Sequence, residues 1–262
     1  MKFLLDFGKA LYNHVLVMIE GLGYNILLFL QTIAQIRYLP KRSKELFLQT
    51  ETSAFGGLPV AMIVGTFTGM VLALQSGIEL ARFRQEASIG MLVSASMCRE
   101  MGPVMTGYIL AGLIGSTIAA ELGTMKVSEE IDALETMSIN PVNFLVLPRI
   151  VSMAIVCPLL TIYTNLIGII GGAVVGNFIL NVNLSVYFRN AADVLTLKDI
   201  YSGLFKAVVF GITIAVVGCA QGLRAEGGAA GVGKATMRAV VISFIAILIL
   251  DYLLTWLFYW TL

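Results

Sequence analysis

Residues 150–188 read IVSMAIVCPLLTIYTNLIGIIGGAVVGNFILNVNLSVYF, a run of 39 residues between Arg149 and Arg189 without one charged side chain. Two shorter uncharged runs precede it, 52–78 with 27 residues and 101–120 with 20. A helix needs roughly 20 apolar residues to cross the ~30 Å hydrocarbon core of a bilayer. These runs therefore predict helices that span a membrane.

The composition of the whole chain agrees with a membrane protein. Of its 262 residues, 58% are hydrophobic and 13% are charged, about half the charged share of an ordinary soluble domain. The net charge of +1 argues against nucleic acid as a partner, because such binding calls for a dense basic face. The three cysteines lie in apolar segments without metal-ligand spacing and are predicted to be small core residues.

The predicted fold class is an all-α integral membrane protein, with a transmembrane domain over residues 51–262. Residues 181–199 are predicted to form an external loop, because their Asn and Asp residues favour turns. The second span is predicted to contain a broken segment before Pro103. The five predicted spans are 54–78, 88–118, 150–179, 201–222 and 237–260.

Residues 1–50 differ from the rest of the chain. Residues 15–36 are apolar but interrupted by Glu20, and four basic residues follow them. This mixture predicts a helix that lies in the membrane interface, followed by a basic cytoplasmic segment. The alternative is a sixth span, which would bury Glu20 at a cost and invert the topology. Asp6, so close to the N-terminus, argues against a removable signal peptide.

Lys and Arg positions predict the orientation, since short cytoplasmic loops retain positive charge. With the N-terminus in the cytoplasm, the inner segments hold 11 basic residues and the outer segments hold four. Glycines spaced by four indicate close helix packing, as in the stripe Gly168, Gly172 and Gly176 and the pairs Gly65 with Gly69 and Gly218 with Gly222.

No catalytic site is predicted. Residues 228–235 resemble the phosphate-binding loop motif of ATPases. However, Ala235 occupies the position of the magnesium-binding Ser or Thr, and the segment lies between two predicted spans. His14 is the only histidine and has no nucleophile or metal pattern around it. The chain is therefore predicted not to be an enzyme and to hold no metal.

Two groups of charged residues are candidates for function. Residues 121–137 are predicted to form a short amphipathic cytoplasmic helix, either a docking element or a plain solvated helix. Arg99, Glu100, Lys206 and Asp251 fall within or beside predicted spans, where each would cost several kcal/mol facing lipid. They are expected either to line a wet site for an anionic head group or to pair with one another.

Several motifs in order resemble the MlaE/YrbE-type permeases associated with MCE proteins, an ABC transporter family concerned with lipid asymmetry. The resemblance covers about residues 50 to 260. Its motifs are GMVLALQ at 69–75, REMGPV at 99–104, AAELGTMKV at 119–127, EIDALE at 130–135, NP at 140–141, LPR at 147–149 and GVGKAT at 231–236.

The resemblance implies a permease dimer in the bacterial inner membrane, with cytoplasmic ABC ATPases that bind ATP and Mg and a periplasmic ring of MCE-domain proteins. Together they would move phospholipid, with no cofactor in this chain. The implied substrate-binding residues are Arg99, Glu100, Lys206, Leu72, Gln75 and Leu80. The implied ATPase-coupling residues are Glu121, Lys126, Glu129, Glu130, Asp132 and Glu135.

Two other classes of function stay open. An ion-coupled secondary transporter or channel would use the intramembrane charges as a relay for protons or ions. A structural scaffold would only hold a partner in the membrane, but it has no reason to bury four charges.

Overall fold

The computed structural model describes residues 20–260, apart from the side chains of Lys41 and Tyr259, and the regular structure in that part is entirely helical. Five helical stretches there are long and apolar enough to cross a membrane: Ser43–Arg82, Glu86–Val127, Val142–Phe178, Leu197–Leu223 and Gly228–Phe258. The predicted all-α fold with five spans is therefore confirmed. The signal-peptide and His14 predictions concern residues outside the described part.

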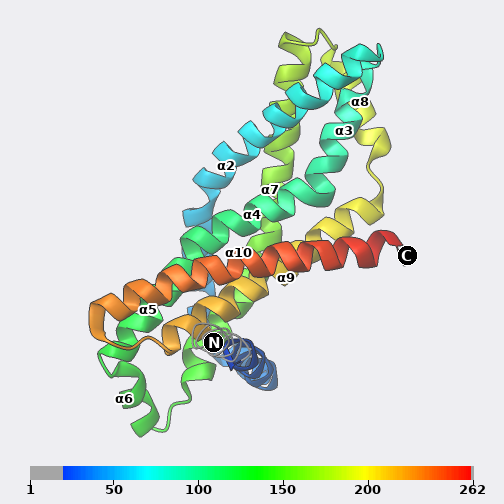
Figure 1. Ribbon diagram of the computed structural model, residues 1–262. Helices are drawn as coiled ribbons and strands as arrows, with labels where there is room; N and C mark the ends of the chain where they lie inside the picture. Colours follow the sequence, from blue (N-terminus) through cyan, green and yellow to red (C-terminus); the bar gives the residue numbers. More distant parts are fainter. Residues whose placement is uncertain (1–19, 261–262) are drawn as a thin grey trace, which may run out of the picture.

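The second stretch is a chain of short helices (Figure 1). It runs through α3 (Ile89–Ser96), α4 (Gly102–Leu110) and α5 (Ser116–Val127), with π-helical turns η3 (Met97–Met101) and η4 (Ala111–Gly115) between them. η3 immediately precedes Gly102 and Pro103, which confirms the predicted break. Proline has no N–H to donate to the preceding turn, so a wider turn at this point is expected.

Glycine allows the closest helix contacts. α2 (Ser43–Arg82) packs along α7 (Leu147–Phe178), and a Cβ on Gly69 would overlap the carbonyl oxygen of Gly168. A Cβ on Gly218 would come within 2.9 Å of the Gly115 carbonyl oxygen. The predicted packing role of the glycine stripes is thus confirmed, because only glycine leaves room for these backbones to meet.

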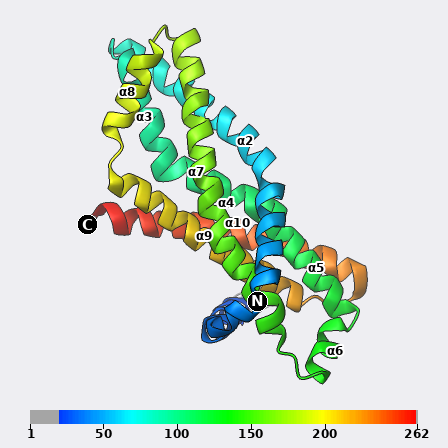
Figure 2. The same cartoon turned by 180° about the vertical axis from the view of Figure 1, so that it is seen from behind.

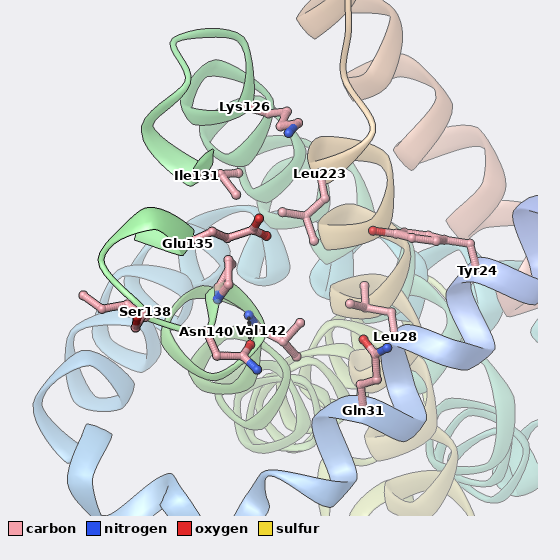
Figure 3. Close-up of a pocket in the computed structure, with 12 residues that line it drawn as sticks. Tyr24, Leu28, Gln31, Lys126, Ile131, Glu135, Ser138, Asn140, Val142 and Leu223 are labelled. Atoms are coloured by element: carbon pink, nitrogen blue, oxygen red, sulfur yellow. Dashed lines mark hydrogen bonds between the residues drawn. The ribbon is translucent and has the colours of Figure 1, made fainter. Parts of the chain in front are cut away.

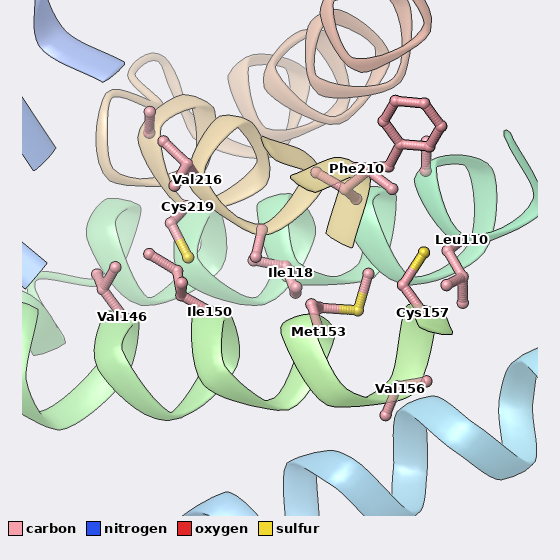
Figure 4. Packing of buried hydrophobic residues seen from close by; sticks show 14 of the residues in the cluster. Leu110, Ile118, Val146, Ile150, Met153, Val156, Cys157, Phe210, Val216 and Cys219 are labelled. Carbon is pink, nitrogen blue, oxygen red and sulfur yellow. The ribbon is translucent and has the colours of Figure 1, made fainter. Parts of the chain in front are cut away.

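The main apolar core lies where α9 (Leu197–Leu223) packs against α5 and α7 (Figure 4). Phe210, Ile118 and Met153 are among its buried side chains. Cys98, Cys157 and Cys219 are all buried and unpaired, as predicted for small core residues.

Residues 181–199, predicted to be an external loop, lie mostly between the third and fourth spans, but they are largely helical rather than irregular. The segment contains α8 (Leu184–Val194), whose first turn is capped by the Asn183 side chain accepting the Ser185 N–H at 2.9 Å. Tyr187 is fully buried against α3 and α7 and donates its hydroxyl to the Ile169 carbonyl oxygen. The Asn residues do mark turns, since Asn181 has a φ of 53°, but they delimit a helix.

The predicted single helix over residues 121–137 is also wrong. Residues up to Val127 continue the membrane stretch as α5, and a separate α6 (Glu130–Thr136) follows. Glu129 between them adopts a φ of 62°, which breaks the helix. Ile131 is buried while Met137 is exposed, so the predicted apolar face is only partly formed.

Residues 20–34 form a helix at the same end of the molecule as α6 (Figure 2). Leu28 and Thr32 are buried on its inner side, and five large apolar side chains are exposed: Leu22, Ile26, Leu27, Leu30 and Ile33. α10 (Gly228–Trp260) ends the described chain and also exposes much apolar surface.

Candidate functional site

Lys206 on α9 is the centre of a buried polar network. Its side chain is 0% exposed, and its ammonium lies 2.6 Å from Glu100 Oε2 and 2.9 Å from Asp251 Oδ1. It also donates to Thr255 Oγ1 at 2.7 Å and to the Arg99 carbonyl oxygen at 3.2 Å. An ammonium has three hydrogens, so these four acceptors saturate it.

The helix break explains why the network forms here. In a regular α-helix the carbonyl of Arg99 would accept the N–H of residue 103, which proline lacks. Lys206 donates to that carbonyl instead. α9 approaches closely because a Cβ on Gly203 would overlap the Cys98 carbonyl oxygen. Lys206 stands three residues later on the same helix face.

Asp199 holds the second cation of the network. Its carboxylate lies 2.7 Å from Arg99 Nε and 3.1 Å from Arg99 Nη2, while its own side chain is 2% exposed. Asp199 also accepts from the Thr196 backbone and hydroxyl in a capping box at the start of α9. The Arg99 side chain is 39% exposed.

The network therefore combines two cations with three carboxylates. Lys206 contacts Glu100 and Asp251, and Arg99 contacts Asp199. Glu100 and Asp251 keep 31% and 21% of their side chains exposed, so the network is partly accessible. Isolated charges would be costly at this depth, and pairing lowers that cost. The pairing alternative raised by the sequence is the arrangement that the structure shows. Binding of a head group stays a prediction.

The other predicted substrate-binding residues lie apart from these contacts. Leu72 and Leu80 on α2 are half-buried against a small apolar cluster that contains Ile89 and Met97, and Gln75 is exposed. Met101 packs on the same cluster one residue after Glu100. This cluster connects the α2 leucines to the network without direct polar contact.

The charges near α6 form separate pairs, unlike the connected network around Lys206. Lys126 lies 2.7 Å from Asp132, and Arg149 lies 2.9 Å from Glu121. The Ser128 hydroxyl donates to Glu130 at 3.1 Å. The Lys126–Asp132 pair joins α6 to α5, and the Arg149–Glu121 pair joins α5 to α7. Glu129, Glu130 and Glu135 are exposed.

A cavity of about 530 Å³ opens beside α6 (Figure 3). Its walls come from the helix at 20–34, the ends of α5 and α9, α6 and the turn at 138–142. A smaller cavity of about 250 Å³ also borders this turn, next to Tyr38 and Arg42. Among the described residues no group of three or more His, Cys, Asp and Glu side chains could hold a metal ion.

The family profile described as "Permease MlaE" matches residues 46–257. This chain belongs to the MlaE permease family. A "Probable ABC transporter permease protein" of Rickettsia typhi is 40% identical over 252 residues, covering 96% of this chain and 97% of the relative. One of Synechocystis sp. is 38% identical over 202 residues, 77% of each chain. Protein TRIGALACTOSYLDIACYLGLYCEROL 1 of Arabidopsis thaliana is 35% identical over 211 residues, 80% of this chain and 60% of the relative.

The resemblance found in the motifs is thus confirmed, and the class of ABC transporter permease subunit is supported for this MlaE-family chain. Its sequence placed Arg99, Glu100, Lys206 and Asp251 in or beside the spans, and the structure brings the four together. Asp199 and Thr255 were missed. The Thr196–Asp199 spacing of a capping box was the available signal for Asp199, whereas Thr255 gave none.

Proposed function

We propose that this MlaE-family chain is the membrane subunit of an ATP-driven phospholipid transporter. The observation that carries the proposal is the polar network deep among apolar helices, with Arg99, Glu100 and Asp251 partly exposed. Such a site suits a ligand that has a charged head and apolar chains. The name of the Arabidopsis relative refers to a diacylglycerol lipid, which supports a lipid substrate.

In this proposal two copies of the chain sit in the bacterial inner membrane with their N-termini in the cytoplasm. A separate ATPase binds ATP and Mg and docks on α6, and MCE-domain proteins receive or deliver phospholipid in the periplasm. The ABC-transporter names of the bacterial relatives support an ATPase partner. The positively charged segments predicted to be cytoplasmic support the orientation.

The ion pairs suggest how force from the ATPase reaches the membrane helices. A displacement of α6 acts on α5 through Lys126 and Asp132, and α5 acts on α7 through Glu121 and Arg149. α5 and α7 both pack on α9, which carries Lys206. Movement of α6 would therefore change the surroundings of the network and its hold on lipid.

Native mass spectrometry of the complex, extracted gently from its own membrane, tests the proposal. We expect two copies of this chain, two ATPase subunits and retained phospholipid. Arg99→Ala should lower the retained phospholipid severalfold while the subunits stay together, because the exposed guanidinium is the cation nearest to a bound head group. Unchanged lipid retention in Arg99→Ala would show that Arg99 is structural.

A second candidate is an ion-coupled transporter. The observation that favours it is Lys206 between the carboxylates of Glu100 and Asp251, an arrangement that could exchange protons. Proteoliposomes containing this chain alone, with a pH-sensitive dye inside, separate the candidates. Proton flux without ATPase supports the ion-coupled class, and its absence together with ATP-dependent lipid movement supports the ABC class.

A further inference from the structure

The cavity beside α6 is separate from the Lys206 network, because none of the network residues lines it. Its lining residues come from the helix at 20–34, α6 and the turn at 138–142, together with the ends of α5 and α9 (Figure 3). The transport mechanism proposed above uses α6 as a docking element but assigns no ligand to this cavity.

The ends of the membrane helices show at which level of the membrane the cavity lies. Lys126 stands one residue before the end of the second span, Val142 begins the third and Leu223 ends the fourth, and all three line the cavity. The outer wall is the helix at 20–34, which turns Tyr24, Leu28 and Gln31 to the cavity and exposes apolar side chains on its other side. Amphipathic helices of this kind lie at the boundary of head groups and acyl chains. The cavity therefore lies at head-group depth.

The charge of the lining favours a cation. Lys126 and Glu135 are its two charged residues, and the Lys126 ammonium is held by Asp132 at 2.7 Å. Among the described residues the Glu135 carboxylate makes no hydrogen bond or ion pair, and it interacts with Lys126 only at longer range. The nearby Arg224 guanidinium pairs with Glu20 at 3.2 Å. One carboxylate is thus left for a positively charged ligand.

Neutral donors complete the lining. Burial raises the pKa of the Tyr24 hydroxyl, so it stays protonated and can donate. The Asn140 side-chain oxygen accepts the Val142 N–H at 2.9 Å, which leaves the amide N–H groups to donate, and Gln31 carries a second amide. Figure 3 shows the Glu135 carboxyl and the Tyr24 hydroxyl turned toward each other from opposite sides. Such donors suit the oxygens of a phosphodiester.

We propose that this cavity binds the head group of a phospholipid that carries a primary amine, taken from the leaflet next to α6. The ammonium pairs with Glu135, and the phosphate accepts from Tyr24, Gln31 and Asn140. The glycerol and the first methylenes lie against Leu28 and Val142. Because α6 forms one wall and the helix at 20–34 another, occupancy fixes α6 and makes its position depend on lipid composition.

Hydrogen exchange of the full chain in nanodiscs tests this site. We expect phosphatidylethanolamine, added to a phosphatidylglycerol background, to slow exchange of residues 130–142. Glu135→Gln should raise the phosphatidylethanolamine fraction needed for half-protection about tenfold, because a charge-assisted hydrogen bond is lost. Tyr24→Phe, which keeps the ring, should weaken protection less. Glu226→Gln is the matched control, since Glu226 is an exposed carboxylate at the same end that does not line the cavity.

Three results would overturn the proposal: equal protection in wild type and Glu135→Gln, equal protection by phosphatidylglycerol alone, or protection that requires added ATPase and no amine lipid. The last result would make the cavity a protein interface. Loss of lipid transport in any variant does not enter this test, so the proposed transport function can fail or hold independently.

Discussion

The Lys206 network and the charges around α6 contain the same kinds of side chain in opposite surroundings. Lys206 and Asp199 are almost completely buried, and each makes several polar contacts. In the Lys126–Asp132 pair beside α6, 34% and 53% of the two side chains are exposed, and one contact joins them. Burial therefore decides whether an ion pair contributes strongly to the stability of the fold or only weakly at its surface.

The energetic reason is solvation. A buried charge that loses its partner remains desolvated and uncompensated, which costs several kcal/mol. An exposed charge that loses its partner is solvated by water, so such pairs contribute little. Salt also screens exposed pairs and hardly reaches buried ones.

Removal of Lys206 should give the largest effect. We expect Lys206→Met to lower the free energy of unfolding by about 3–5 kcal/mol, because Glu100 and Asp251 lose their shared cation. Lys126→Met is the matched control and should cost about 1 kcal/mol or less. Thermal unfolding of the purified variants in the same detergent measures both.

A triple variant sharpens this test. Lys206→Met combined with Glu100→Gln and Asp251→Asn removes the charges together, and stability should largely return. If the single variant is as stable as wild type, or the triple is no better than the single, the network is not an electrostatic unit.

The Asp199 contact should rank second. Asp199→Asn weakens the pair with Arg99 and the cap of α9 and should cost about 2–3 kcal/mol, since hydrogen bonds to a buried charged group are lost. Asp132→Asn, in the exposed pair, should cost about 1 kcal/mol or less. Unfolding should be measured at low and at high NaCl concentration. The stability lost in Asp132→Asn should fall with salt, whereas the loss in Asp199→Asn should not change. Equal salt dependence of the two losses would show that the buried and the exposed pair do not differ in solvent screening.

The close approach of α9 should rank third. Gly203→Ala forces α9 away from the Cys98 carbonyl oxygen and should cost about 1–3 kcal/mol through overpacking. Gly233→Ala, where a Cβ meets nothing within 4 Å, should be neutral or stabilise α10 by up to about 1 kcal/mol. Chemical denaturation compares the two, and equal stability would mean that α9 has room to shift.

Much of the fold could be predicted because the membrane imposes simple rules. Long apolar stretches, three of them containing uncharged runs of 20 residues or more, predicted five spans, and glycine spacing predicted which faces pack closely. The break before Pro103 could also be predicted, because proline removes a backbone donor. These are local properties of the chain.

The misses concern residues whose roles depend on the folded arrangement. Asp199 looked like part of a loop, but α8 and the capping box place it at the start of a membrane helix. In the sequence, Thr255 is an ordinary polar residue of a span. Its role is visible only in the folded chain, where it donates to Glu100. The break at Glu129 could not be predicted, because its left-handed backbone occurs at a residue that is not glycine. Which side chains on different helices contact one another depends on tertiary packing, so residue spacing along a single helix does not predict it.

The acidic residues at the start of α6, Glu129 before it and Glu130 in it, should have the smallest effect on stability. Glu129→Ala with Glu130→Ala should change the free energy of unfolding by no more than about 0.5 kcal/mol, because both side chains are exposed. If α6 is the docking element for the ATPase, the same variant should nevertheless recover much less ATPase when the chain is purified through a tag. Glu226→Ala, at the same end, controls for the loss of negative charge alone. Unchanged ATPase recovery in the double variant would remove the docking role from these two residues, and the acidic turn would then be only a solvated surface.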